Sequence, residues 1–437
     1  MRRVTTDGTR TSATLPSPHP WACYHEAADT ALDAVLAGDA LRTVFQPLVW
    51  LDSGALAGVE ALTRGPADHP LTMPEDLFAA ARRAGRVLEL DRACARRALT
   101  ACRDRGIDGG APVFVNLEAV SLTPRLVRKV AAMRDGLAPR ARVVIEITER
   151  AIGDDPAGIL AAVREARRHG LGVALDDVGA EPASLALLPL VRPDVVKLDR
   201  SVVRTTDRVQ AAAMASAVGA YAESSGAVVV AEGIETDADR AWAVAIGAHV
   251  GQGWLFGRPR ELVELDRPVT AVALLREPHA DPAQTPFSLV AMQGDIRVAR
   301  KAELLAMSRH LERVAGQWNA DASCVTACFQ NVGHLDAATA EVYADLARRS
   351  PLVAVFGAGL PSCPAPGVRG VPLSLDDPLR DEWNVVVLGP HHASALLSRD
   401  LGDAGADRDR RFEFLVTHRR DLVVQATRAL VARMTGG

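Results

Sequence analysis

Residues 171–177 read LGVALDD and residues 193–199 read PDVVKLD, two apolar runs of strand length that contain polar residues near their ends. Six further runs between residues 43 and 255 have the same character: TVFQPLV, GALAGVEAL, PVFVNL, RVVIEITE, AVVVAEGIE and AHVGQGWL. Continuous Val, Ile, Leu and Ala runs are typical of parallel strands that are buried on both faces. Helix-like segments separate most of them, and the repeat of roughly 30 residues is that of a βα unit. The pattern predicts an α/β fold of the TIM (β/α)8 barrel class.

The polar residues of these runs predict a metal site. In a (β/α)8 barrel the carboxyl ends of the strands open on one face, so residues far apart in the chain can share a pocket. Carboxylates gathered there would repel one another unless cations neutralised them. Carboxylate and amide oxygens suit Mg2+ or Mn2+, and the absence of His and Cys from the set argues against zinc. The set consists of Gln46, Glu60, Asn116, Glu146, Asp176 with Asp177, Lys197, Glu232 and Gln252.

Each of these residues has a chemical role and a structural alternative. The adjacent Asp176 and Asp177 suit two cations, which together would activate a water molecule. Lys197 would orient that water or neutralise phosphate charge, and Glu232 is a candidate general base. Arg64 has the side chain for bidentate phosphate binding. A single carboxylate after a strand is most often a helix N-cap or a first-turn acid, but caps would not supply a polar group near the end of almost every strand. The pattern favours a metal-dependent barrel enzyme of the phosphoryl-transfer or enolising type.

Bulk composition narrows the class of protein. The chain has 437 residues, 48% hydrophobic and 24% charged, with a net charge of −4 and a pI near 6.3. This length predicts about two domains. Without a broad basic field, duplex nucleic acid is not an expected partner. No apolar run reaches the ~20 residues of a membrane span, the N-terminus lacks the apolar core of a secretory signal, and the six cysteines are sparse. We therefore expect a soluble, cytoplasmic protein.

Changes in composition predict the domain boundaries. Residues 1–22 have the composition of a disordered tail, 23–262 form the barrel domain, 263–285 are a linker rich in Pro and charge, and 286–437 form a second, smaller α/β domain. A lead-in helix is expected at 24–38. Apolar spacing predicts barrel helices at 75–105, 156–169, 208–225 and 236–246.

The second domain has no apparent catalytic set. We expect it to open with a strand (SLVAMQG) and a helix (KAELLAMSRHLERVA) and to close with a long helix at 411–434. The CxxxC spacing of Cys324 and Cys328 is compatible with zinc, but the apolar residues between them favour a buried strand. His391-His392 is interpreted as a helix start and not as a ligand pair. Asp381, Glu382 and Trp383 suit either a ligand pocket or a buried Trp flanked by capping acids, and we favour the second interpretation.

The barrel region resembles the EAL-domain phosphodiesterases of cyclic di-GMP over residues 40–262. The similar motifs, in family order and spacing, are FQPLV (45–49), VEALTR (59–64), VNLEAVSL (115–122), IEITER (145–150), LDDVGAEPASLALLPLVRPDVVKLDRSVV (175–203), VVAEGIET (229–236) and GQGWLFGRP (251–259). The resemblance implies a modified TIM barrel that opens cyclic di-GMP to linear pGpG with two divalent cations, Mg2+ or Mn2+, in bacterial second-messenger signalling. It disfavours an unrelated enolising enzyme, and the absence of a GGDEF motif argues against synthesis of the dinucleotide.

The resemblance also implies a role for each matched residue. Glu60, Asn116, Glu146 and Asp176 match ligands of the first metal, and Asp177 matches a ligand of the second. Lys197 and Glu232 match residues that hold and activate water, and Glu149 matches a glutamate that steadies a mobile loop. The matches to substrate-contacting or supporting positions are Gln46, Leu62, Arg64, Glu235 and Gln252.

One loop departs from the family pattern. Residues 176–185 read DDVGAEPASL where the family usually reads DDFGTGYSSL, so Val178 replaces a Phe and Ala180-Glu181-Pro182 replaces Thr-Gly-Tyr. In the family this loop positions the second metal and takes part in dimers, which implies a homodimer through the EAL domain. Pro182 stiffens the loop, and Glu181 adds negative charge near a phosphate ligand. Two hypotheses follow: an active phosphodiesterase, or a catalytically weak or inactive EAL domain that acts as a cyclic di-GMP receptor.

The second domain resembles the DICT sensory domain, which occurs fused to cyclic di-GMP enzymes and two-component proteins. The similar stretches are ACFQNVGHL (327–335), YADLARRSPLVAVFG (343–357), DPLRDEWNVVVLGP (377–390), LLSRDL (396–401) and RRFEFLVTHRRDLV (410–423). The resemblance implies that this domain regulates the barrel in response to an unknown signal or partner.

Overall fold

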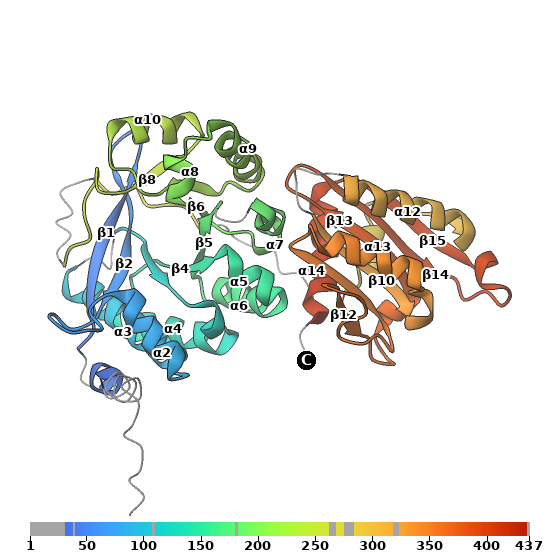
Figure 1. Ribbon diagram of the computed structural model, residues 1–437, viewed down its shortest axis with the longest axis horizontal. Helices are drawn as coiled ribbons and strands as arrows, with labels where there is room; N and C mark the ends of the chain where they lie inside the picture. The colour runs from blue at the N-terminus through green and yellow to red at the C-terminus, as the bar shows by residue number, and fades with distance from the viewer. Residues whose placement is uncertain are drawn as a thin grey trace, which may run out of the picture.

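The chain forms two α/β domains that lie side by side (Figure 1). The computed structural model describes residues 31–37, 40–106, 110–179, 182–261, 268–274, 284–317 and 323–434. The predicted tail at 1–22, most of the predicted lead-in helix and most of the predicted linker lie outside these residues. The last part of the lead-in helix, 31–37, is helical.

Eight strands close into a barrel, as the apolar runs predicted. They are β1 (Arg42–Trp50), β2 (Leu56–Arg64), β3 (Val113–Asn116), β4 (Val143–Thr148), β5 (Gly172–Val178), β6 (Val195–Leu198), β7 (Val228–Ala231) and β8 (Val250–Gln252). All neighbours from β2 to β8 are parallel, but β1 is antiparallel to both β2 and β8, which modifies the regular barrel. In this register Gln46 lies opposite Glu60, so β1 contributes its polar residue from its middle and not from its carboxyl end.

One apolar residue from each strand fills the barrel interior. The set comprises Leu48, Ala57, Phe114, Val144, Ala174, Val195, Val230 and Val250, and all are fully buried. Because side chains alternate between the two faces of a strand, residues two positions away from these on β1 and on β3 to β8 also point inward. The other face of the strands packs against the surrounding helices in the main apolar cluster of the protein.

Helices surround the barrel. They are α2 (Pro74–Arg83), α3 (Val87–Asp104), α4 (Pro124–Leu137), α5 (Glu149–Asp154), α6 (Pro156–Arg168), α7 (Leu188–Val191), α8 (Arg200–Arg204), α9 (Arg208–Ser225) and α10 (Asp237–Ala245), with short 3-10 helices η1 (Ala119–Ser121) and η2 (Pro182–Leu187). The helical pattern predicted over 75–105 forms two helices, because Gly85 has a left-handed φ of 66° and separates α2 from α3.

The second domain is a seven-stranded mixed sheet with helices. Its sheet order is β12-β11-β10-β13-β14-β15-β9, and its strands are β9 (Arg297–Arg300), β10 (Cys324–Asn331), β11 (Leu352–Ala358), β12 (Arg369–Pro372), β13 (Glu382–Leu388), β14 (Ala393–Asp400) and β15 (Arg411–Thr417). The helical elements are α11 (Pro286–Ala291), α12 (Lys301–Gln317), η3 (Val332–His334), α13 (Ala337–Ala347), η4 (Pro378–Asp381), η5 (Asp407–Asp409), α14 (Arg420–Val431) and η6 (Ala432–Met434).

Three predictions for this domain are wrong. The SLVAMQG segment lies mostly in α11 and not in a strand, because Thr285 and Ser288 form a capping box and Pro286 occupies the first turn. The predicted helix at 411–434 begins only at α14, since its first part alternates apolar and polar residues and pairs as β15. His391 and His392 lie in the turn before β14 and do not start a helix.

None of the described helices combines the length and the apolar character that a membrane span requires.

Candidate active site at the barrel mouth

Most polar residues of the predicted set share one structural position. On β3 to β8, each polar residue comes two positions after the apolar residue that fills the barrel interior, as Lys197 follows Val195 and Glu232 follows Val230. On the antiparallel β1, Gln46 comes two positions before Leu48. All of these side chains therefore point into the barrel in a layer above its apolar core.

Lys197 occupies the centre of this layer. Its side chain is 1% exposed, and its Nζ lies 2.7 Å from Oε1 of Glu232 and 2.9 Å from Oε1 of Glu146. Oδ1 of Asp176 lies 3.0 Å away and Oε2 of Glu60 lies 3.5 Å away. None of these four acids caps a described helix, where the caps include Thr123, Asp155, Asp199 and Thr236. Capping of a described helix therefore does not account for these four acids.

Amide side chains hold Glu60 in place. The amide nitrogen of Asn116 donates to Oε1 of Glu60 at 2.7 Å, and Nε2 of Gln252 donates to Oε2 at 2.5 Å. The same Nε2 lies 3.2 Å from Oε1 of Gln46, whose own Nε2 donates to the carbonyl of Gly257 at 3.2 Å. These bonds fix both oxygens of one carboxylate, as a preorganised ligand requires.

An irregularity in β5 brings two consecutive aspartates together. The register of β5 with β6 shifts between Leu175 and Val178, and Asp177 has a left-handed φ of 56°. Consecutive strand residues normally point to opposite faces, so this bulge is what brings the second carboxylate to the same side. Ligand oxygens of Asp176, Asp177 and Glu232 lie within 4.8 Å of one another. Asp is among the few residues that adopt a left-handed conformation at modest cost.

Burial and mutual repulsion shift the pKa values of the acids. Burial, together with Glu60 and Asp176, raises the pKa of Glu146 well above its usual range. Burial also raises the pKa of Glu232 to about 8, although Lys197 opposes the shift. Burial raises the pKa of Asp177 too, with help from Asp176. For Glu60, burial acts in the same direction, but Lys197 and the amide hydrogen bonds outweigh it and lower the pKa.

The residues present fit divalent cations. Glu60, Glu146, Asp176, Asp177 and Glu232 provide five carboxyl groups against the single ammonium group of Lys197, so the fully ionised group carries a net charge of −4. Oε2 of Glu146 is buried and has no hydrogen-bond partner among the described residues. An all-oxygen donor set with excess negative charge suits hard cations of the Mg2+ or Mn2+ type.

The remaining predicted residues lie around this centre with less constraint. Arg64, at the end of β2, is half-buried and donates to the carbonyl of Thr63 at 2.8 Å. Leu62 is half-buried on the same strand. Glu235 pairs with Arg204 at 2.5 Å and so lies outside the carboxylate group around Lys197. The side chain of Glu149, the first residue of α5, lies outside the described part of the structure, as do residues Ala180 and Glu181.

Our sequence interpretation missed an aromatic residue that lies close in the chain to Gln252. Trp254 is half-exposed two positions after Gln252, and the guanidinium of Arg258 stacks over its ring at 3.8 Å. An exposed indole ring is suited to stacking with a planar ligand group. The GQGWLFGRP run contained the signal, since a Trp in a Gly-rich segment after a strand has no apolar stripe to join.

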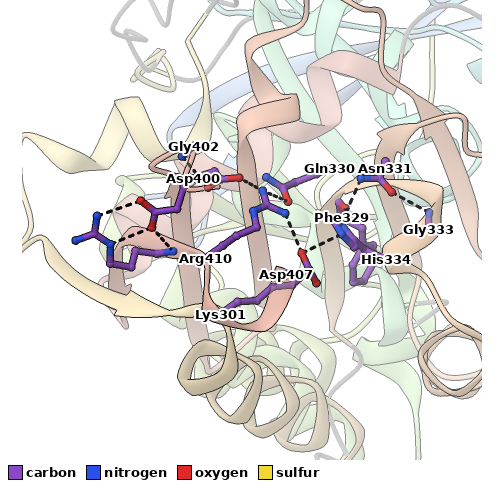
Figure 2. Close-up of polar contacts among 12 residues, drawn as sticks. Lys301, Phe329, Gln330, Asn331, Gly333, His334, Asp400, Gly402, Asp407 and Arg410 are labelled. Atoms are coloured by element: carbon purple, nitrogen blue, oxygen red, sulfur yellow. Dashed lines mark hydrogen bonds and ion pairs between the residues drawn. The ribbon is translucent and has the colours of Figure 1, made fainter. Parts of the chain in front are cut away.

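The second domain contains a cavity of about 610 Å3, and its lining includes Gln330, Asp377, Asp381, Asp400 and Arg410. Figure 2 shows Arg410 between Asp400, Asp407 and Gln330, with Lys301 and His334 beside Asp407. All members of this network except Gln330 are charged or ionisable, and the cation and carboxylate groups pair with one another.

Two further predictions for the second domain concern residues of β10 and β13. Cys324 and Cys328 are buried in β10, as expected of a strand and not of a zinc site, and burial raises the pKa of both thiols to about 12. Glu382 and Trp383 are buried in β13, where Glu382 accepts from the backbone nitrogen of Phe287. Asp381 lines the cavity, as the ligand-pocket alternative predicted, whereas Trp383 is buried, as the other alternative predicted.

Comparison with known proteins assigns both regions to families. A model of the EAL domain matches residues 28–259, and a model of the DICT domain, described as the sensory domain in diguanylate cyclases and two-component systems, matches residues 288–401. The crystal structure of the Xanthomonas citri FimX EAL domain in complex with c-diGMP covers 56% of this chain and 98% of that chain, with 18% identity and a TM-score of 0.50. At this identity the likeness concerns the fold.

Two curated relatives come from Pseudomonas aeruginosa. The bifunctional diguanylate cyclase/cyclic di-GMP phosphodiesterase MucR is 30% identical over 234 residues, which are 51% of this chain and 33% of MucR. The cyclic di-GMP phosphodiesterase RocR is 31% identical over 221 residues, which are 49% of this chain and 56% of RocR. The match therefore spans between a third and a little more than half of these relatives.

Proposed function

The chain belongs to the EAL-domain family, and from this premise we propose that its barrel hydrolyses cyclic di-GMP to linear pGpG with the help of two divalent cations, Mg2+ or Mn2+. The DICT sensory domain, for which we propose boundaries of 286–437, would regulate this activity. The names of MucR and RocR support cyclic di-GMP hydrolysis at the level of the family. A homodimer through the barrel domain remains part of the proposal.

The observation that carries the proposal is the layer of carboxylates around Lys197. We assign Glu60, Asn116, Glu146 and Asp176 to one cation and Asp177 to the other, and cations bound there would supply Lewis-acid activation of water and of phosphate. Lys197 would neutralise charge that develops on the phosphate, and Glu232 would hold and deprotonate the attacking water. The pKa of Glu232 near 8 without cations would fall once cations neutralise its acidic neighbours.

The other residues would bind the dinucleotide. Arg64 would contact a phosphate, and Leu62 and Gln252 would line the pocket beside it. Glu235 and Gln46 support neighbouring elements through Arg204 and Gln252. Glu149, directly after β4, would steady the loop that follows β5.

The test is incubation of the purified full-length protein with cyclic di-GMP and Mn2+, with products separated by chromatography. We expect linear pGpG, no product with EDTA, and a loss of at least about 1,000-fold in turnover for Glu60→Gln, because the first cation loses a charged ligand. The matched control is Glu223→Gln on the exposed face of α9, which should leave turnover unchanged.

The loop at 178–182 separates the two functional hypotheses. If the wild-type protein binds cyclic di-GMP tightly but forms no product with any divalent cation, the phosphodiesterase proposal fails and the receptor alternative holds. A variant that carries Phe-Gly-Thr-Gly-Tyr at 178–182 then shows whether the loop is responsible. Val178 is fully buried, so the added Phe volume should also cost about 1–3 kcal/mol of stability.

A further inference from the structure

Two arginines of the second domain bind main-chain carbonyl groups of the barrel. Nε and Nη2 of Arg428, on α14, donate to the carbonyl of Leu190 at 2.8 and 2.6 Å. Nη1 of Arg369, on β12, donates to the carbonyl of Asp154 at 3.1 Å, and its Nη2 donates to that of Gly153. Figure 1 shows α14 and β12 on the side of the second domain that faces α5, α6 and α7.

The carbonyl groups that these arginines bind belong to segments that follow ligand-bearing strands. Gly153 and Asp154 end α5, which begins directly after β4 and therefore shortly after Glu146. Leu190 is in α7, which η2 connects to β5 and its two aspartates. η2 packs against both α5 and β5, so the two segments support each other beside the left-handed turn at Asp177.

These segments depend on tertiary contacts for their position. α5 has six residues and α7 has four, and helices this short are not stable alone. The last carbonyls of a helix have no partner within it and carry partial negative charge, so a guanidinium is a favourable partner. Leu188, Leu190 and Val191 are fully buried in the same apolar cluster as α14 residues such as Leu430.

We propose that Arg369 and Arg428 are positioning residues through which the second domain sets the cation affinity of the Asp176–Asp177 pair. This inference rests on the proposed function only in that the pair binds a divalent cation. By holding the ends of α5 and α7, the two arginines restrain η2 and with it the bulge that turns both carboxylates to one side of β5.

A further ion pair connects the segment directly after α14 to the cavity of the second domain. Nε of Arg433, in η6 directly after α14, lies 3.3 Å from Oδ2 of Asp377, which lines the cavity. η6 also packs against α6 of the barrel. A ligand that engaged Asp377 would therefore act on η6, which directly follows the helix that carries Arg428.

The experiment measures Mn2+ binding to the full-length protein by electron paramagnetic resonance, without substrate. For Arg428→Ala we expect a roughly tenfold weaker Mn2+ affinity, as is typical when groups that orient metal ligands are lost. Arg428→Lys should recover part of the loss, because a single ammonium can still donate to the Leu190 carbonyl. Arg369→Ala should also weaken Mn2+ affinity. The double variant should lose less binding free energy than the two single variants together, since α5 and η2 support each other.

The control is Arg411→Ala on β15, whose side chain pairs with Asp403 within the second domain. Unchanged Mn2+ affinity in both Arg369→Ala and Arg428→Ala, at the level of Arg411→Ala, would overturn the inference even if the variants were less stable. If the wild-type protein binds Mn2+ but does not hydrolyse cyclic di-GMP, the proposed function fails while the affinity comparison still decides this inference. If the wild-type protein is active, both arginine variants should lower kcat at limiting Mn2+. Their KM for the dinucleotide should change by a smaller factor.

Discussion

At the scale of single residues, Lys197 compensates part of the negative charge of the site when no cation is bound. A fully buried lysine would normally lose its charge, but four carboxylates raise its pKa well above the usual range despite the burial that lowers it. Its ammonium group occupies the centre of a ring that otherwise contains acids and amides. Removing one partner of a buried ionic group is strongly destabilising because the remaining charges are uncompensated.

We therefore predict that Lys197→Met loses about 3–5 kcal/mol of unfolding free energy in EDTA, measured by urea denaturation. Saturating Mn2+ should restore part of this loss, since bound cations replace the missing positive charge and stabilise the folded state by mass action. Lys129→Met on α4 is the control, because this lysine lies outside the ring. Equal stability of Lys197→Met and wild type in EDTA would contradict the electrostatic account.

At the scale of elements, α3 supports the loop that follows β3. Asp91 of α3 is fully buried and accepts from the backbone nitrogen of Glu118 at 3.2 Å, two residues after Asn116. Burial raises its pKa to about 7. The folded protein therefore holds a proton that the unfolded chain, with a carboxyl pKa near 4, releases at lower pH.

The folded-state pKa lies above the unfolded value, so the stability that this proton contributes is present at low pH and is lost as pH rises towards 7. We predict that Asp91→Asn flattens the pH dependence of urea denaturation. The difference in unfolding free energy between variant and wild type should shift by about 2 kcal/mol in favour of the variant from pH 5.5 to pH 8.5. Asp104→Asn, on the exposed end of the same helix, should not change the slope. An unchanged slope in Asp91→Asn would show that Asp91 is ionised in the folded state at pH 5.5.

Element prediction succeeded where local pattern and tertiary role agree. The eight apolar runs form strands, because a strand that is buried on both faces requires apolar residues at almost every position. SLVAMQG is also apolar and of strand length, but the Thr285 capping box lies just before it and turns the segment into α11. The RFEFLVT segment alternates polar and apolar residues and was predicted within a helix because the helical pattern of α14 follows two residues later.

At the scale of the whole molecule, the two domains share apolar core. One continuous cluster contains Leu187 and Leu188 of the barrel together with Leu422 and Leu430 of α14. A separate cluster, which includes Leu396 of β14, consists of second-domain residues only. The shared cluster predicts that loss of packing on the α14 side of the second-domain sheet also destabilises the barrel. Loss of packing in the separate cluster should destabilise the second domain only.

We predict that Leu430→Ala costs about 2–5 kcal/mol and accelerates amide hydrogen exchange in β5 and α7 as well as in the second domain. Leu396→Ala, also fully buried, should have a similar cost but leave exchange in the barrel unchanged. Hydrogen exchange measured by mass spectrometry resolves the two domains. Identical exchange patterns in both variants would contradict the coupling through α14.

The sequence by itself was sufficient to predict the barrel and the residues of its polar layer, and it predicted oxygen-bound cations for that layer. Apolar period, strand length and ligand chemistry are local properties, and they do not depend on how distant segments meet. Only the tertiary structure decided that β1 runs antiparallel, that a left-handed Asp177 turns two adjacent carboxylates to one side, and that Arg369 and Arg428 bind the segments beside them. These features arise from closure of the barrel and from contact between domains, where residues more than 200 positions apart become neighbours.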